Sequence, residues 1–173
     1  MKLFCIPYAG GSATTYYKFR KALAGTAEII PLELPGKGMR EGEPFARSIP
    51  DLAAEFCRIV REKAADAPYA IMGYSLGGII AFELYREIAS RSLRLPAKMI
   101  FSACEAPDVF RENNRAGLYR LPDREFIREV GKFGFIPSEL KENEELLKFF
   151  LPVMKADFKL AADYWPDDRK LLL

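Results

Sequence analysis

Short apolar segments that alternate with helical patterns constrain the fold of this chain more than any other feature. The sequence predicts four strands and three helices, which follow one another in the order 2–6, 14–24, 27–32, 48–64, 68–73, 77–89 and 98–103. Strands that alternate with helices in this way form βαβ units with a parallel sheet. We therefore expect an α/β fold, a mostly parallel sheet with helices on both of its faces.

The alternation stops near residue 104, and only helical periodicity follows. Breaks in this second segment are expected at Pro122, Gly131, Gly134, Pro137 and Pro152. The segment is both charged and apolar, which indicates amphipathic helices that cover the sheet. We expect residues 1–107 to form the N-terminal part of the core, residues 108–165 an inserted helical lid, and residues 166–173 the start of the return to the core.

Length and charge exclude several classes of function. A chain of 173 residues fits one domain. Lys and Arg number 26 against 24 Asp and Glu, so no basic excess is available for nucleic acid or for a polybasic membrane anchor. No apolar run reaches the roughly 20 residues of a membrane span. The three cysteines form no CxxC pair, so neither disulfides nor a metal site are expected. The sequence predicts a reduced, cytoplasmic protein without nucleic-acid or membrane partners.

The strongest motif is Gly-x-Ser-x-Gly, formed by Gly73, Ser75 and Gly77. It follows an expected strand and opens an expected helix, which are the two contexts that a nucleophile elbow requires. Such a turn lifts the serine hydroxyl above the sheet, and small residues let strand and helix pass closely. We predict that Ser75 is a catalytic nucleophile and that the backbone N–H of Leu76 binds a developing oxyanion.

A second oxyanion donor is expected from the loop after the first strand. This loop contains Gly10 and Gly11, and the N–H of Ala9 is the candidate, with Tyr8 as second choice. The alternative interpretation is a phosphate-binding loop, but the spacing matches neither GxGxxG nor GxxxxGK[ST]. The stretch 36–38, Gly-Lys-Gly, also fails that spacing and is expected to be a surface turn.

Several stretches of the chain resemble one family in particular. They are CIPYAGG at 5–11, ELPGKGMR at 33–40, GYSLGG at 73–78, SACEAP at 102–107, LPD at 121–123 and FLPVMKADF at 150–158. With them the chain resembles the type II thioesterases of nonribosomal peptide and polyketide synthetases, a branch of the α/β-hydrolases. The resemblance implies hydrolysis of acyl thioesters on the phosphopantetheine arm of acyl or peptidyl carrier domains, as editing of misprimed synthetases in antibiotic biosynthesis. It implies no cofactor beyond the partner's phosphopantetheine.

The chain departs from that family because it contains no histidine. Two accounts are open: an inactive homologue, or an N-terminal portion whose C-terminal strands are missing. We favour the second, since the family places its acid and its histidine after the lid. About 60 further residues would complete the sheet. The 173 residues alone are then expected to be inactive, because serine needs a base to become nucleophilic.

The catalytic acid is less well defined by the sequence. Glu105 and Asp108 follow the fourth strand, where some related thioesterases place their acid, so Glu105 is a weak alternative. Further carboxylates near the end of the chain are expected to be solvated or locally paired: Asp157, Asp163, Asp167 and Asp168. Two other functions remain open. One is a stand-alone serine esterase or lipase, and the other is a non-catalytic pseudoenzyme that binds synthetase modules.

Overall fold

The computed structural model describes residues 1–106, 117–132, 136 and 143–165. Its sheet has four strands, β1 (Lys2–Ile6), β2 (Glu28–Pro31), β3 (Tyr69–Tyr74) and β4 (Lys98–Ser102). Their spatial order is β2-β1-β3-β4, and all neighbouring pairs are parallel. In register, Phe4 lies opposite both Ile30 and Ile71. The predicted parallel sheet is confirmed.

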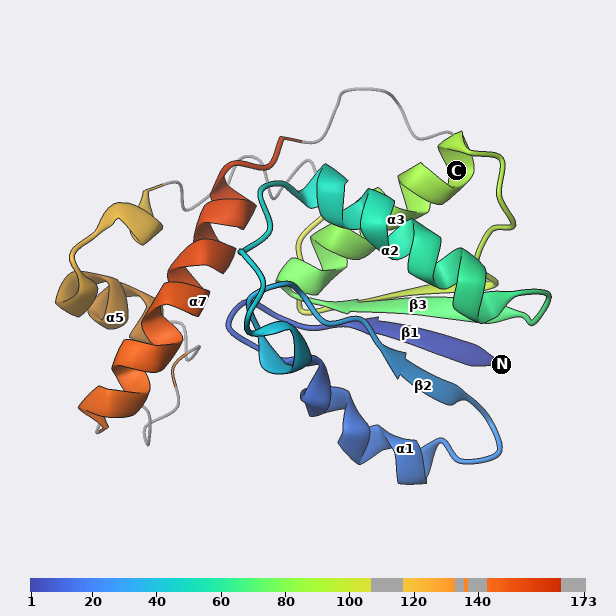
Figure 1. Ribbon diagram of the computed structural model, residues 1–173, viewed down its shortest axis with the longest axis horizontal. Coiled ribbons are helices and arrows are strands. Elements are labelled where there is room, and N and C mark those ends of the chain that lie inside the picture. Colours follow the sequence, from blue (N-terminus) through green and yellow to red (C-terminus); the bar gives the residue numbers. More distant parts are fainter. Residues whose placement is uncertain (107–116, 133–135, 137–142, 166–173) are drawn as a thin grey trace.

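Helices cover both faces of this sheet (Figure 1). On one face lie α2 (Ile49–Ala64) and α3 (Leu76–Ser90), and on the other lie the 3-10 helix η1 (Ala13–Lys18) and the short α1 (Phe19–Ala22). The side chain of Ser48 caps α2 by accepting a hydrogen bond from the Asp51 N–H at 3.1 Å. Apolar residues of the sheet, α2 and α3 form the main core, in which Phe4, Phe56 and Ile80 are fully buried.

The first helical segment differs from its prediction. Instead of one helix over 14–24, the chain forms η1 and a single turn of α-helix that ends at Ala22. The segment begins with two threonines and two tyrosines, and β-branched and aromatic residues have a low helix propensity. Tyr16 serves the core instead: its ring is buried and its hydroxyl donates to the Ile6 carbonyl at 2.8 Å.

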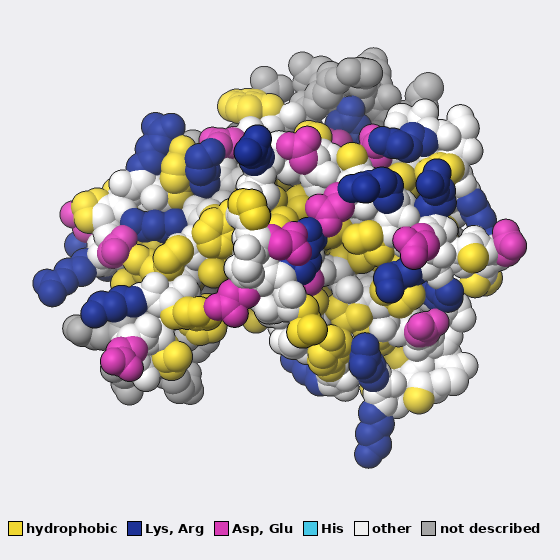
Figure 2. All heavy atoms as spheres, viewed as in Figure 1, with side chains coloured by type: hydrophobic (Ala, Val, Ile, Leu, Met, Phe, Trp, Pro, Cys, Tyr) yellow, Lys and Arg dark blue, Asp and Glu magenta, His cyan; other side chains and the backbone are white. Residues whose placement is uncertain are grey.

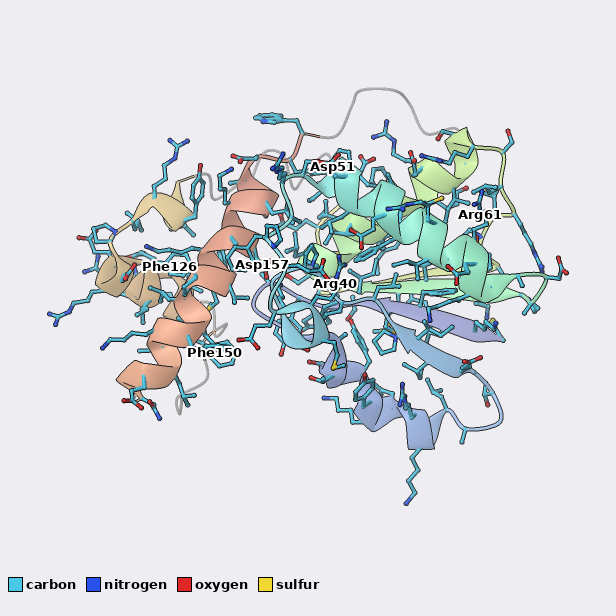
Figure 3. All side chains as sticks on the ribbon, in the orientation of Figure 1. Arg40, Asp51, Arg61, Phe126, Phe150 and Asp157 are labelled. Atoms are coloured by element: carbon cyan, nitrogen blue, oxygen red, sulfur yellow. The ribbon has the colours of Figure 1, made fainter. Side chains whose placement is uncertain are left out.

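A group of helices lies beyond the carboxyl ends of the strands (Figure 1): η3 (Leu118–Arg120), α5 (Asp123–Gly131) and α7 (Glu144–Ala162). They share a small apolar cluster, here called the α5–α7 cluster, which comprises Phe126, Val130, Ile136, Leu151 and Met154. Figure 3 shows Phe126 between the two helices. At the C-terminal end of α7, Leu160 belongs to the main core, and so does Tyr164, which comes just after the helix. The helical segment therefore packs on itself and on the sheet domain.

Of the expected breaks in this segment, two coincide with helix boundaries. Pro122 precedes α5, and Gly131 ends it. Pro152 does not break α7, although it removes one backbone donor from the helix. Leu151 and Met154 on either side are buried, and their packing holds the helix together. Gly134, Pro137 and the predicted boundaries at 107/108 and 165/166 adjoin or lie outside the described residues.

The outer strand β4 differs from the other three in its exposure. Ile100 and Phe101 are 39% and 49% exposed, whereas β1 and β3 are mostly buried. No strand in the described part of the chain pairs with the outer edge of β4. Among the same residues, no helix has both the length and the apolar character needed to cross a membrane.

Candidate active site

Ser75 occupies the turn between β3 and α3, as the motif predicted. Its backbone has φ +53° and ψ −117°, a left-handed conformation that is strained for a residue with a side chain. The Ser75 N–H donates to the carbonyl of Ser102 at 2.8 Å, which ties the turn to the end of β4. A strained serine between a buried strand and a helix N-terminus is the geometry of a nucleophile elbow.

Close backbone contacts impose this turn. A Cβ atom at Gly73 would lie 2.1 Å from the Gly77 carbonyl oxygen, and one at Gly77 would lie 2.2 Å from the Ile6 carbonyl oxygen. A Cβ at Gly78 would lie 2.5 Å from Cys104 Sγ. Strand β3, helix α3 and the end of β1 therefore meet without space for a methyl group. The small residues predicted at 73 and 77 are confirmed as a steric requirement.

The loop that follows β1 lies directly against the elbow. A Cβ at Gly77 would also approach the Pro7 carbonyl oxygen to 2.7 Å, and the Tyr8 ring packs edge-on against Tyr74 at 5.4 Å between centroids. Leu76 begins α3, so helix geometry leaves its N–H without an acceptor inside the helix. The structure thus brings Ser75, Leu76 and the loop that contains Ala9 together. Their catalytic roles stay predictions.

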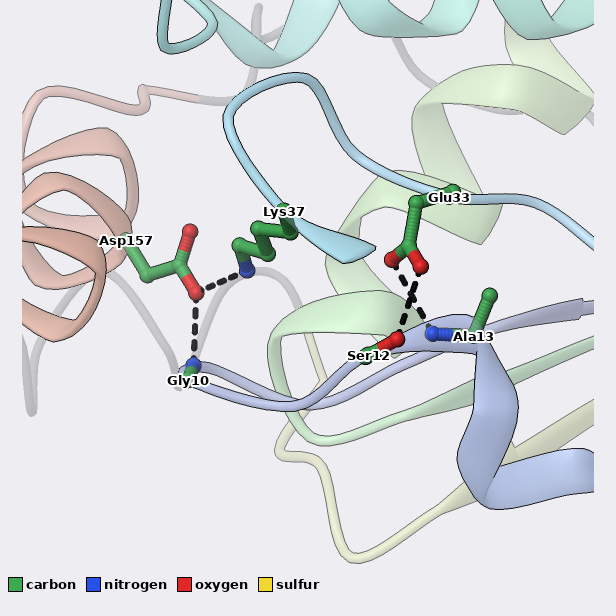
Figure 4. Close-up of polar contacts among 6 residues, drawn as sticks. All are labelled: Gly10, Ser12, Ala13, Glu33, Lys37 and Asp157. Carbon is green, nitrogen blue, oxygen red and sulfur yellow. Dashed lines mark hydrogen bonds and ion pairs between the residues drawn. The ribbon is translucent and has the colours of Figure 1, made fainter. Parts of the chain in front are cut away.

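Two carboxylates from distant parts of the chain hold this loop (Figure 4). Asp157 of α7 accepts a hydrogen bond from the Gly10 N–H at 2.6 Å. Glu33, which follows β2, accepts from the Ser12 hydroxyl at 2.7 Å and from the Ala13 N–H at 3.0 Å. The loop is therefore held at the first residue of its glycine pair and again just after the pair.

Asp157 is not solvated, contrary to the expectation from sequence. It is 3% exposed, and its partner is Lys37, itself 4% exposed, at a separation of 120 residues. Burial raises the pKa of Asp157, and the Lys37 ammonium and the Gly10 N–H oppose that rise. In Figure 3 the Asp157 side chain extends from α7 toward the loops at the carboxyl ends of the strands.

The stretch 36–38 is likewise not a simple surface turn. Gly36 and Lys37 are buried, whereas Gly38 and Met39 are exposed. Gly38 has φ +46°, and a Cβ there would lie 2.2 Å from Glu33 Oε2. Arg40 fixes the far end of the stretch through Glu43 at 2.6 Å and Glu55 at 2.7 Å. The turn brings the Lys37 side chain inward to Asp157.

A second buried carboxylate holds the chain just after the C-terminal end of α7. Glu83 of α3 is 9% exposed, pairs with Arg86 at 2.7 Å and accepts a hydrogen bond from the Tyr164 hydroxyl. Burial and the hydrogen bond to Glu83 raise the pKa of the Tyr164 phenol. Helix α7 is thus joined to the sheet domain by polar contacts near its middle and just beyond its end. The space-filling view shows a hollow between α7 and α1 (Figure 2).

The remaining candidate residues have less defined surroundings. Glu105 is described and exposed, so nothing in its burial favours it as the catalytic acid, and Asp108 lies outside the described residues. Burial raises the pKa of the Cys5 thiol to about 12 and raises that of Cys104 as well, which makes both poor nucleophiles. Within the described residues, no three His, Cys, Asp or Glu side chains gather as metal ligands would.

The parallel sheet, the strained serine elbow and the adjoining β1 loop define an α/β-hydrolase. A family model described as "Thioesterase domain" matches residues 1–172, and the chain belongs to the thioesterase family. It is 30% identical over 167 residues to the gramicidin S biosynthesis protein GrsT of Aneurinibacillus migulanus, a match that covers 95% of this chain and 63% of that protein. The chain therefore spans less than two thirds of this curated relative.

Solved structures agree with this assignment. ClbQ from the colibactin NRPS/PKS pathway superposes with a TM-score of 0.88 at 37% identity, over 96% of this chain and 69% of that one. YbtT, a type II thioesterase from the yersiniabactin NRPS/PKS pathway, superposes with a TM-score of 0.82 at 30% identity, over 96% and 66% of the two chains. These relatives confirm the resemblance to type II thioesterases and the α/β-hydrolase fold.

Proposed function

We propose that this chain supplies the nucleophile of a thioesterase that hydrolyses acyl or aminoacyl thioesters on the phosphopantetheine arm of carrier domains. The observation that carries the proposal is the strained Ser75 elbow packed against the β1 loop. The relatives named for NRPS/PKS pathways support the substrate class. Removal of misprimed acyl groups in the cytoplasm would be its task, with a carrier domain as partner and no cofactor of its own.

In the proposed reaction, Ser75 Oγ attacks the thioester carbonyl while a base removes the hydroxyl proton. The carbonyl oxygen becomes an oxyanion that the N–H groups of Leu76 and Ala9 stabilise. The carbon–sulfur bond then breaks, the pantetheine thiol leaves with the proton, and the acyl group stays on Ser75. Water, deprotonated by the same base, hydrolyses this ester and restores the serine.

These 173 residues contain no histidine, and we propose that a histidine outside them supplies the base. We accordingly propose that the 173-residue chain alone is inactive, since an oxyanion hole without a base gives only residual catalysis. We keep Glu105 as a weak alternative for the acid. We also propose that residues 108–165 act as a lid over the acyl group, which the position of α7 beside the β1 loop supports.

The test compares three substrates with one acyl group: the acyl-carrier protein, the acyl-pantetheine and a simple ester. They are offered to the polypeptide isolated from its native host and to its Ser75→Ala variant. We expect a kcat/KM that is highest on the carrier-bound thioester, and a loss of several orders of magnitude in the variant. Preference for the free ester would support an esterase, and unchanged turnover in Ser75→Ala would overturn the proposal.

The non-catalytic alternative follows from the absence of histidine in this chain. It predicts carrier binding without turnover, even in the polypeptide from the native host. Mass spectrometry of that polypeptide separates the two cases, because an active thioesterase requires a histidine in the polypeptide or in a tightly bound partner. An active sample with no histidine anywhere would contradict the mechanism.

A further inference from the structure

We propose that Asp157 is a positioning residue for the oxyanion hole, which it orients by holding the Gly10 N–H from helix α7. This inference rests on the proposed function, in which Ala9 is an oxyanion donor. Asp157 and Gly10 are 147 residues apart, and their bond of 2.6 Å is short for an N–H donor to a carboxylate. The carboxylate therefore accepts a hydrogen bond from the peptide that directly follows Ala9.

Gly10 is suited to this contact by its own geometry. Its φ of +77° turns the peptide in a way that residues with a side chain rarely adopt, and a Cβ there would lie 3.1 Å from Met154 Cγ. Met154 and Asp157 are three residues apart and share one face of α7. The helix thus contacts Gly10 through an apolar side chain and a carboxylate, which together fix the loop against it.

Ala9 is held from both sides in this arrangement. Upstream, the Tyr8 ring packs on Tyr74, the residue before the nucleophile, and the Tyr8 carbonyl accepts from the Gly11 N–H at 2.9 Å. Downstream, Asp157 holds the Gly10 N–H. If Asp157 lost its charge, the Gly10 N–H would lose its anionic acceptor, and the backbone after Ala9 would be held less firmly. The Ala9 N–H lies in the peptide just before that backbone, so it would be aimed less well at a point beside Ser75.

The charge on Asp157 needs an explanation, since a buried ion pair is seldom the most favourable way to join two elements. Replacing such pairs by apolar residues of similar volume is often neutral or stabilising. Lys37 and Asp157 are both almost fully buried, so the desolvation cost is paid by each. We explain the carboxylate of Asp157 by its bond to the Gly10 N–H, for which a charged acceptor is stronger than a neutral one. The Lys37 ammonium offsets part of the cost of burying that charge.

The consequence is a coupling between α7 and the oxyanion hole. Any displacement of the middle of α7 must break the bond to Gly10 or move the β1 loop with it. The half of α7 that precedes Pro152 contacts the α5–α7 cluster and is not joined to the loop by these bonds. Motion that admits an acyl chain without loss of the oxyanion hole is therefore confined to that half.

The first test is spectroscopic and uses the double variant Lys37→Met with Asp157→Leu, which replaces the pair by apolar residues of similar length. In the ¹⁵N-labelled polypeptide produced in its native host, the Gly10 amide proton of the unmodified protein should resonate far downfield and exchange slowly. In the double variant it should move upfield and exchange faster. The isosteric Asp157→Asn provides a second variant should the double variant fail to fold. A Gly10 resonance unmoved in whichever variant folds would overturn the proposal.

The second test is kinetic and uses acyl-pantetheine with the polypeptide from the native host. Loss of one oxyanion donor lowers kcat about 100- to 1,000-fold. The misaimed donor in Asp157→Asn should therefore lower kcat about 10- to 100-fold. KM should change little, because the ground-state thioester does not depend on the hole. Asp163→Asn, in the exposed pair of α7 with Lys159, is the matched control and should leave kcat unchanged.

The two proposals fail in different ways. If Ser75→Ala keeps full turnover, the proposed function is wrong. If Ser75→Ala is inactive while the Asp157 variants keep their kcat, the proposed function stands and the positioning role is wrong. A rise in KM with an unmoved Gly10 resonance would assign Asp157 to substrate binding, which also contradicts the proposal.

Discussion

The two sides of the proposed oxyanion hole are built by different means. The Leu76 side depends on backbone against backbone: Gly73 and Gly77 leave no space for a methyl group, and Ser75 has a strained φ. The Ala9 side depends on side chains from far along the chain, Asp157 and Glu33, which hold the loop by hydrogen bonds. The first side is rigid by steric exclusion, whereas the second depends on charges that a single substitution removes.

Breaking the steric side should have the largest effect. In Gly77→Ala the new methyl group would lie 2.2 Å from the Ile6 carbonyl oxygen, and backbone cannot yield as a flexible side chain does. We expect a loss of about 4 kcal/mol or more in the free energy of unfolding, or no folded protein. The matched control is Gly42→Ala, where a Cβ would meet nothing within 4 Å. Urea unfolding of both variants checks this, and equal stabilities would contradict the account.

Breaking the charged side should cost less and should be reversible by a second substitution. Lys37→Met leaves the Asp157 carboxylate buried without its ammonium, which we expect to cost about 3 kcal/mol. Adding Asp157→Leu should restore most of that loss. Thermal unfolding of the single and double variants measures the difference, with Lys159→Met in an exposed pair as control. A double variant as unstable as the single one would show that the pair is not coupled.

The anchor at the end of α7 provides a smaller effect. Tyr164→Phe removes the hydroxyl that donates to the buried Glu83, and we expect a loss of about 2 kcal/mol, the cost typical of a hydrogen bond to a charged group. Tyr119→Phe is the control, because the Tyr119 hydroxyl accepts a hydrogen bond from the exposed Arg120. Hydrogen exchange along α7 should rise in the first variant alone, and equal exchange would argue against an anchor.

The smallest effect is a dependence on alkaline pH. Burial raises the pKa of Tyr69 to about 12, against about 10 in an unfolded chain. Below pH 10 the phenol is neutral in both states. Between pH 10 and 12 the unfolded phenol loses its proton while the folded one keeps it, so stability falls as pH rises. Tyr69→Phe should lessen this fall between pH 10 and 12 in urea unfolding; an unchanged slope would contradict the prediction.

The sequence predicts the first side of the hole and not the second, for a physical reason. The elbow lies within six consecutive residues, and strand, turn and helix preferences around Ser75 are local. The contact of Lys37 with Asp157 spans 120 residues, and a lysine between two glycines resembles a surface turn. One signal could have revealed it: Asp157 lies three residues after Met154 and three before Leu160, so it falls on the apolar face of α7.

Local patterns also mislead where tertiary packing decides. Pro152 predicts a break, yet the buried residues around it keep α7 continuous. The helical spacing of apolar residues over 14–24 predicts one long helix, yet burial of Tyr16 against β1 favours a 3-10 helix and a single turn. By contrast, the four strands and the helix that Ser48 caps follow from periodicity and capping alone, because their core-facing residues recur at regular spacing.

The central claim is that the strained elbow makes Ser75 the residue that receives the acyl group. Treatment of the polypeptide from the native host with a fluorophosphonate, followed by mapping of the modified peptide, tests it directly. The account predicts a single adduct on Ser75, which Ser75→Ala abolishes, and no adduct on the 173-residue chain expressed alone. An adduct on another residue, or labelling that survives unchanged in Ser75→Ala, would contradict it.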